Sequence, residues 1–205
     1  SVIKFALGLY LAILLNENLP FKAIIRAIVL IPFIVPTVLS AIAFWWIYDP
    51  QFSVISWSLK KTGLITENIN FLGDAWNSRF AVIFANVWRG VPFIAISLLA
   101  GLQTVPASLY EAATLDGATR WQAMLYIIIP VAVPGILSAM IFAFTLSWNE
   151  FIYALVFLSS PEQKTVPVGV ISELVRGDVF FWGPLMAGAL FGSIPVAIAY
   201  SFFVE

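Results

Sequence analysis

The chain has no cysteine and no histidine. Without cysteine it can form neither a disulfide bond nor a thiolate metal site. Without histidine it lacks the usual zinc or haem ligand and the usual general base, so a serine–histidine catalytic pair is impossible. The phosphate-binding pattern G-x-x-x-x-G-K-[S/T] is also missing, so this chain cannot hydrolyse ATP itself. We expect no metal or cofactor site in it.

Charge is scarce as well. Of the 205 residues, 10% are charged and 61% are hydrophobic, and the mean hydropathy is +0.99. Soluble domains carry about 25% charged residues. The net charge of -1 gives no basis for binding nucleic acid. The composition therefore predicts an integral membrane protein of the all-α class, a polytopic transmembrane helical bundle.

Five apolar stretches are long enough to cross the bilayer or to form part of a span, which needs about 20 residues. They are residues 2–15, 23–48, 80–103, 121–158 and 184–204. The first is short and begins inside an apolar run without the features of a signal peptide. We therefore expect a single transmembrane domain, 1–205, truncated at its N-terminus, with five spans visible of a six-helix core.

Prolines are expected to distort these spans, because each removes a backbone hydrogen bond. Pro32 and Pro36 should kink the second span, and Arg89-Gly90 with Pro92 should interrupt the third. Pro130 and Pro134 should divide residues 121–158 into an interfacial piece and a crossing piece.

Two polar stretches should lie outside the spans. Residues 49–79 are rich in tryptophan and phenylalanine, which favours short helices along the membrane surface. Residues 159–183 are expected to form a surface loop. Gly188 and Gly192 form G-x-x-x-G, which permits close helix packing and leaves open whether a second chain uses it.

The long amphipathic segment begins at Pro106 and should leave the bilayer. Pro106 is placed as a first-turn proline of a short helix, and Gly117 should end that helix at positive φ. Thr119 and Gln122 then match a capping box. The segment 106–121 is thus predicted to be a helix, a sharp corner and a second helix.

Within this segment Ala112 and Ala113 are small enough to let another surface approach, and Glu111 and Asp116 offer charges to it. Such a shape can dock in a groove. An amphipathic loop without a partner is the alternative.

The order Glu111-Ala112-Ala113, Gly117, Ile127 and Ile129-Pro130 resembles the E-A-A, G, I-x-L-P signature of the membrane subunits of binding-protein-dependent ABC importers, with Ile129 in place of leucine. In that family the segment is a cytoplasmic coupling helix that inserts into a cleft of the ATPase subunit. The resemblance implies the ABC type I importer permease fold. It also implies ATPase contacts by six residues: Glu111, Ala112, Ala113, Leu115, Asp116 and Gly117.

The resemblance further implies partners. They are a second permease subunit, identical or different, two ATPase subunits that bind ATP and Mg, an extracytoplasmic solute-binding protein, and membrane lipid. The location would be the inner or plasma membrane of a bacterium or archaeon. A cytoplasmic coupling segment puts Lys22, Arg26 and Arg120 inside but Lys60, Lys61, Arg79, Lys164 and Arg176 outside, against the positive-inside rule.

Charged residues at membrane depth usually face a cavity or a partner, which singles out Arg89 and Glu150. Glu150 lies in the run Trp148-Asn149-Glu150-Phe151, about 30 Å along the helix from Pro130. A ring, an amide and a carboxylate together suit a polyhydroxylated solute. Alternatively, Trp148 marks the interface and Asn149 and Glu150 pair with a neighbour such as Arg89.

Trp148–Phe151, followed by Thr165–Gly169, resembles one subunit type of carbohydrate importers of the maltose/glycerol-phosphate class. Leu30–Pro36 and Trp88–Phe93 look more like the other type, so a heterodimer and a homodimer both stay open. The favoured function is a permease subunit that moves a sugar or polyol by alternating access.

Two other classes are weighed. An ion-coupled carrier or channel would use Arg89 and Glu150 along its pathway, without an ATPase. An intramembrane aspartyl enzyme would need two carboxylates at membrane depth. The four aspartates instead fall in predicted loops or at their edges: Asp49, Asp74, Asp116 and Asp178.

Overall fold

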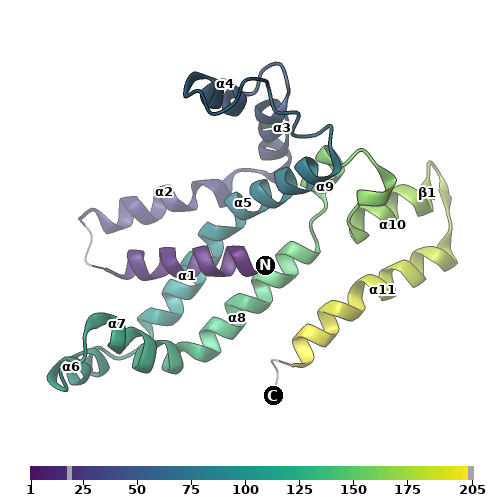
Figure 1. The fold of residues 1–205 in the computed structure, drawn as a ribbon. Coiled ribbons are helices and arrows are strands. Elements are labelled where there is room, and N and C mark those ends of the chain that lie inside the picture. Colours follow the sequence, from purple (N-terminus) through teal and green to yellow (C-terminus); the bar gives the residue numbers. More distant parts are fainter. Residues whose placement is uncertain (18–19, 203–205) are drawn as a thin grey trace. The chain divides into compact units, whose positions relative to one another are not determined.

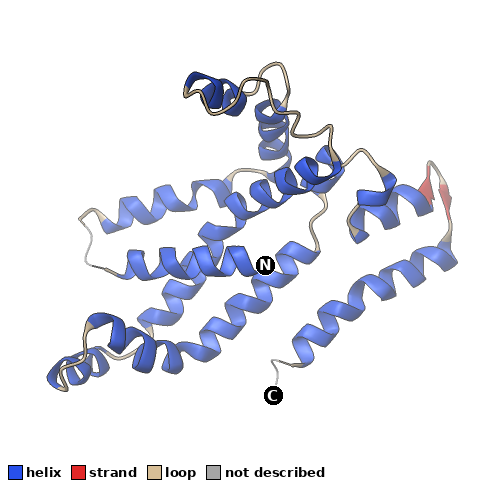
Figure 2. Cartoon of the chain, in the orientation of Figure 1, coloured by secondary structure: helices blue, strands red, loops and turns tan. Residues whose placement is uncertain are grey.

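The computed structural model describes residues 1–17 and 20–202, which are almost entirely helical (Figures 1 and 2). The α-helices are α1 (Val2–Asn16), α2 (Lys22–Ile34), α3 (Thr37–Tyr48), α4 (Val54–Lys61), α5 (Ala75–Gln103), α6 (Ala107–Leu115), α7 (Arg120–Ala123), α8 (Ile129–Trp148), α9 (Ile152–Phe157), α10 (Val166–Leu174) and α11 (Trp182–Ser201). A π-helical turn, η1 (Met124–Ile128), joins α7 to α8, and η2 (Pro161–Gln163) is a 3-10 turn. Strands β1 (Val175–Arg176) and β2 (Val179–Phe180) form a small antiparallel hairpin. The predicted all-α class is confirmed.

Three helical segments are long and apolar enough to cross a membrane: residues 75–103, 121–157 and 182–201. The pair α2 and α3 makes a fourth if it counts as one broken span, and α1 is a shorter apolar helix of 15 residues. All five predicted stretches are therefore helical. The break between α2 and α3 falls at Val35 and Pro36, as the prolines predict.

Other prolines disturb the helices less than expected. α5 continues through Arg89, Gly90 and Pro92 without interruption. Pro130 and Pro134 both lie inside α8, and this helix ends only at Trp148. The π turn precedes this region, and there the N–H of Ile129 bonds to the carbonyl of Met124, five residues back. Local rearrangement of the hydrogen bonds thus lets a membrane helix carry proline without ending.

The two polar stretches also differ from expectation. Residues 49–79 contain one short helix, α4, then turns and the first residues of α5. Residues 159–183 hold η2, α10, the hairpin and the start of α11 instead of a plain loop. Asp49 accepts hydrogen bonds from the N–H groups of Gln51 and Phe52, and Asp74 accepts from Trp76 and Asn77 at the start of α5. Each aspartate therefore stabilises a turn, because its carboxylate accepts hydrogen bonds from N–H groups two and three residues later.

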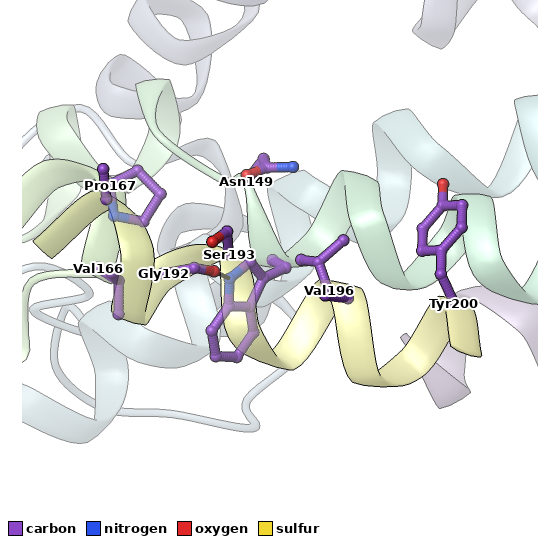
Figure 3. Close-up of a pocket in the computed structure, with 10 residues that line it drawn as sticks. Asn149, Val166, Pro167, Gly192, Ser193, Val196 and Tyr200 are labelled. Carbon is purple, nitrogen blue, oxygen red and sulfur yellow. Dashed lines mark hydrogen bonds between the residues drawn. The ribbon is translucent and has the colours of Figure 1, made fainter. Parts of the chain in front are cut away.

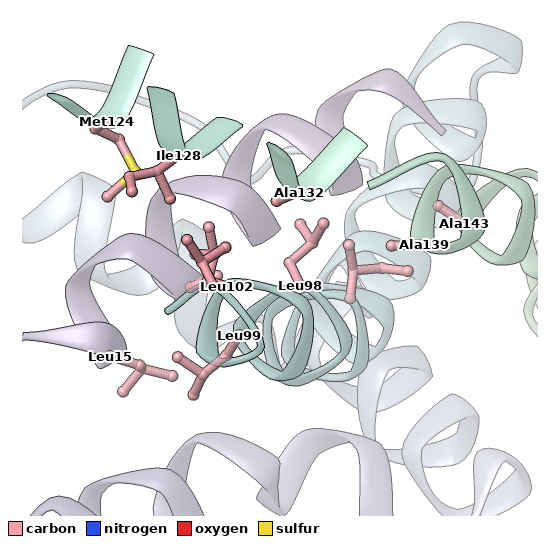
Figure 4. Close-up of a cluster of buried hydrophobic side chains, with 12 residues drawn as sticks. Leu15, Leu98, Leu99, Leu102, Met124, Ile128, Ala132, Ala139 and Ala143 are labelled. Atoms are coloured by element: carbon pink, nitrogen blue, oxygen red, sulfur yellow. The ribbon is translucent and has the colours of Figure 1, made fainter. Parts of the chain in front are cut away.

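The chain divides into two compact units, Ser1–Ile34 with Arg89–Leu146, and Val35–Trp88 with Ser147–Glu205. The first unit is built around leucines and alanines of α1, α5 and α8, together with Met124 and Ile128 of η1. In Figure 4, Leu98 and Leu102 of α5 point toward the turns that carry Ile128 and Ala132. A Cβ added to Gly135 would lie 3.5 Å from the Cα of Gly101, so α5 and α8 approach through glycines.

The second unit has an aromatic core made by α3, the first part of α5, and α9. Phe44 and Tyr48 pack against Tyr153 and Phe157. The hydroxyls of Ser40 and Tyr153 share a buried hydrogen bond of 2.6 Å.

The glycine pair of α11 packs inside this second unit. A Cβ added to Gly188 would lie 3.0 Å from Cγ2 of Val170, and one at Gly192 would lie 3.3 Å from Cγ1 of Val166. The G-x-x-x-G face therefore receives α10 of the same chain.

Candidate functional site

The amphipathic segment folds as a helix, a corner and a helix, as predicted. Pro106 sits at the N-cap of α6, one position before the predicted first turn, with φ −58° and ψ 137°. The helix ends at Leu115, and Gly117 takes φ +79°. A hydrogen bond of 2.9 Å from the N–H of Ala118 to the carbonyl of Ala113 closes the turn.

The capping box is present in both directions. The N–H of Thr119 donates to Oε1 of Gln122 at 2.8 Å, and the N–H of Gln122 donates to Oγ1 of Thr119 at 3.3 Å. Each side chain satisfies a backbone donor that the start of a helix leaves free. The corner is thus fixed by bonds between residues close in sequence.

One face of α6 points outward and the other packs inward. Glu111, Ala112 and Asp116 are exposed, and Leu115 is 89% exposed. Ala113 is only 1% exposed, because its face of α6 also carries Leu109, which packs on the core of the first unit. The expectation that both alanines lie on the surface is therefore wrong for Ala113, which contributes packing instead.

Three large side chains after the corner are also exposed, which the sequence reasoning missed. Trp121 is 63% exposed, Leu125 is 55% exposed and Tyr126 is 76% exposed. They lie in residues 121–157, which are long and apolar enough to cross a membrane, and exposed apolar side chains in such a segment can face lipid. We call the exposed residues of α6 and its corner, Glu111, Ala112, Leu115 and Asp116, the coupling surface.

A second candidate site is a cavity of about 530 Å³ within the second unit (Figure 3). It brings two predicted residues, Trp148 and Asn149, together with side chains that the sequence reasoning did not select. These are Val166, Pro167, Ala189, Gly192, Ser193, Val196, Ala197 and Tyr200. Most come from α11, and Ser193, Val196 and Tyr200 follow one another along it in Figure 3. In the sequence, only the spacing of three and four residues between these α11 positions could have indicated that they share one face of a helix.

The wall of this cavity mixes apolar and polar groups. The indole of Trp148 supplies a flat ring, and Asn149, Ser193 and Tyr200 supply an amide and two hydroxyls. Lys164 forms a salt bridge with the adjoining helix α10, where its Nζ lies 2.8 Å from Oε1 of Glu173. The hydrogen bond from Lys164 holds the pKa of the Glu173 carboxyl below its usual value.

Glu150 and Phe151 follow the cavity residues but do not line it. Oε1 of Glu150 accepts the N–H of Tyr153 at 3.0 Å, near the start of α9, and Oε2 accepts a hydrogen bond from Nδ2 of Asn86. The carbonyl of Glu150 accepts from Oγ1 of Thr165 at 2.9 Å. Phe151 is the N-cap residue of α9. These contacts give Glu150 a structural role in the turn between α8 and α9.

Arg89 belongs to the first unit. Its guanidinium carbon lies 5.4 Å from the centre of the Phe33 ring, a cation–π contact. Close by, Lys4 is buried, and a Cβ on Gly90 would lie 2.9 Å from its Cδ and Cε. Two cationic side chains of the first unit, Arg89 and Lys4, thus lie near the turn of α5 that contains Gly90.

Apolar helices of spanning length define the chain as an integral membrane protein, and its helical corner is exposed. Residues 4–205 match the family described as binding-protein-dependent transport system inner membrane component, and the chain belongs to that family.

Similar proteins include the trehalose/maltose transport system permease protein MalF of Thermococcus litoralis. It is 40% identical over 135 residues, which are 66% of this chain and 45% of that protein. The trehalose transport system permease protein SugA of Mycobacterium tuberculosis is 30% identical over 203 residues, 98% of this chain and 63% of that protein. The chain therefore spans about half the length of the curated relatives it matches.

Among solved structures, the fold matches a bacterial ABC transporter involved in the import of the acidic polysaccharide alginate. The TM-score is 0.84 at 23% identity, over 97% of this chain and 70% of that one. The permease fold expected from the coupling signature is confirmed.

Proposed function

We propose that this chain is a permease subunit of an ATP-driven importer that moves a sugar or a related polyol. The observation that carries the proposal is the corner at Gly117, which presents Leu115 at 89% exposure beside two carboxylates. A rigid, protruding and partly apolar corner suits insertion into a cleft of another protein. The ATPase partners would bind ATP and Mg and transmit their closure to α6.

The solute class follows from the cavity and from the relatives. Two relatives carry trehalose or maltose according to their names, and the alginate transporter carries a polysaccharide. An aromatic ring with an amide and hydroxyls around it suits a sugar, whose ring has an apolar face and hydroxyls at its edge. We assign solute contact to Trp148 and Asn149, and assign Glu150 and Phe151 to the turn behind them.

The mechanism would be alternating access, with two permease subunits rocking between inward and outward openings. The second subunit could be identical or different. One structure of the alginate transporter contains a periplasmic protein bound to alginate pentasaccharide, and a comparable solute-binding protein would deliver solute here. The membrane would be the inner or plasma membrane of a bacterium or archaeon.

Crosslinking tests this proposal, because the chain has no native cysteine. Leu115→Cys, expressed with candidate ATPase subunits that carry single cysteines along their clefts, should form a disulfide whose yield changes with ATP. Ala113→Cys is the buried neighbour control, and Leu64→Cys, 72% exposed on the 49–79 stretch, is the exposed control. Neither should crosslink.

Transport without any ATPase, together with no crosslink from Leu115→Cys in an inserted chain, would contradict the proposal. That outcome would favour the ion-coupled carrier, with Arg89 and Glu150 along its pathway.

A further inference from the structure

The second unit contains another cavity, of about 330 Å³, that neither coupling nor solute handling uses. It lies among α3, α4, the turn before α5, and the first part of α5. The lining residues are Tyr48, Ile55, Ile69, Phe71, Asn77, Phe80, Ala81 and Phe84. Half of them are aromatic, and only Tyr48 and Asn77 carry polar side-chain atoms.

Those polar groups are already engaged. The hydroxyl of Tyr48 donates to the carbonyl of Ala81 at 3.2 Å, and Nδ2 of Asn77 donates to the carbonyl of Asn70 at 3.3 Å. A polyhydroxylated solute would find few partners here, and its hydroxyls would lose hydrogen bonds to water without replacement. The cavity is suited to hydrocarbon instead.

The rim of the cavity is apolar and exposed. Phe80 is 64% exposed and Phe84 is 57% exposed, and both lie on α5, a helix of spanning length and composition. Exposed phenylalanines on a membrane helix face lipid at low cost. The cavity therefore has an apolar rim on a helix that meets lipid.

Two tryptophan–cation pairs lie on α4 and α5, two helices that contribute residues to this cavity. Nζ of Lys61 lies 5.0 Å from the centre of the Trp57 ring, at the end of α4, and the guanidinium carbon of Arg79 lies 5.0 Å from the Trp76 ring, in the first turns of α5. Both tryptophans are more than 60% exposed. Such rings prefer the headgroup level of a bilayer.

The same elements also line the cavity. Ile55 belongs to α4, and Asn77 and Phe80 lie two residues before and one after Arg79. Among the described residues no ion pair engages Lys61 or Arg79. Two cations at headgroup level beside an apolar cavity match the charge and shape of an anionic lipid.

We propose that this cavity binds an acyl chain of an anionic phospholipid whose phosphate group is held by Arg79 and Lys61. The assignment accounts for cations on the side of the membrane where the positive-inside rule does not expect them. It is independent of the transported solute.

Lipid retention tests the assignment. The full-length protein, purified with its partner subunits, would be equilibrated in mixed micelles with equal amounts of phosphatidylglycerol and phosphatidylcholine, and bound lipids counted by native mass spectrometry. Phosphatidylglycerol should be retained preferentially. Arg79→Gln and Lys61→Gln should each weaken its binding about fivefold, since a cation at the surface contributes this much toward an anionic lipid.

Two controls separate the parts of the proposal. Arg176→Gln removes a cation of the 159–183 stretch and should leave retention unchanged. Phe84→Ala should weaken the binding of both lipids, because it removes part of the apolar wall of the cavity.

Equal retention of the two lipids, or the same loss with Arg176→Gln as with Arg79→Gln, would overturn the assignment. Glycerophosphoglycerol, the headgroup without acyl chains, should not displace the lipid. If it does, the site takes a free headgroup and the acyl part is wrong.

Discussion

The indole N–H of Trp148 donates a hydrogen bond of 2.8 Å to the carbonyl oxygen of Gly192. Trp148 is the last residue of α8, and Gly192 lies in the middle of α11. Because glycine has no side chain, the ring can reach the backbone of α11 directly. The bond holds the ring as a wall of the cavity of about 530 Å³.

Replacing this tryptophan should separate its two roles. Trp148→Phe keeps a ring but loses the donor, which should lower the free energy of unfolding by about 1 kcal/mol and change solute affinity little. Trp148→Ala should weaken solute affinity about tenfold or more, because the stacking surface is lost. Uptake kinetics in proteoliposomes and thermal unfolding would measure both. Trp182→Ala, at an exposed position outside the cavity, is the control, and equal effects from it would contradict the assigned role.

Glu150 offers a second test. Glu150→Ala removes the acceptor for the N–H of Tyr153 and should destabilise the protein by about 1 kcal/mol. Glu150→Gln keeps an acceptor oxygen for that N–H and should destabilise the protein less than Glu150→Ala does. Neither variant should change solute affinity, because Glu150 does not line the cavity. Thermal unfolding and uptake kinetics would measure these effects, and a changed solute affinity in Glu150→Gln at unchanged thermal stability would contradict the structural role.

The glycine face of α11 predicts a pairwise effect within the chain. Gly188→Ala places a methyl group 3.0 Å from Cγ2 of Val170, which should cost about 1 kcal/mol through overpacking. Val170→Ala in the same protein should relieve much of that cost. Gly183→Ala, where a Cβ meets nothing within 4 Å, is the matched control in the same helix.

Thermal unfolding of the unmodified chain, the single variants Gly188→Ala and Val170→Ala, and the double variant would give the interaction energy between positions 170 and 188. If Gly188→Ala instead altered subunit association with no coupling to Val170, the glycine face would serve a second chain.

Local chemistry explains which features the sequence could predict. The corner at Gly117 and the capping box of Thr119 and Gln122 depend on residues within a few positions of one another, and they were predicted correctly. The burial of Ala113 depends on how α6 packs against α7 and η1 after the corner, which is a tertiary contact that local rules do not give, and it was not predicted. Similarly, six of the ten residues that line the cavity beside Trp148 come from α11, more than thirty residues later in the chain, and no local pattern pairs those segments.

The prolines of α8 show that a local rule can also predict a helix end that the folded chain does not have. A local rule ends helices at Pro130 and Pro134, but the π turn before them and the packing of α8 keep the helix continuous. Hydrogen bonding that shifts by one residue is not visible in a hydrophobic pattern.

The last prediction compares two glycines that have the same backbone requirement in different places. Gly117 has φ +79° and Gly177, in the β1–β2 hairpin, has φ +61°, and a Cβ on either meets nothing within 4 Å. Alanine at each position should therefore cost about 1–2 kcal/mol of local backbone strain and little else. Only Gly117→Ala should reduce solute-stimulated ATP hydrolysis by the assembled transporter, because only that corner shapes the coupling surface. Measuring ATPase activity and thermal unfolding side by side separates the loss of coupling from the loss of stability. Equal solute-stimulated ATP hydrolysis in the two variants would mean that the ATPase partner does not depend on the conformation of the corner.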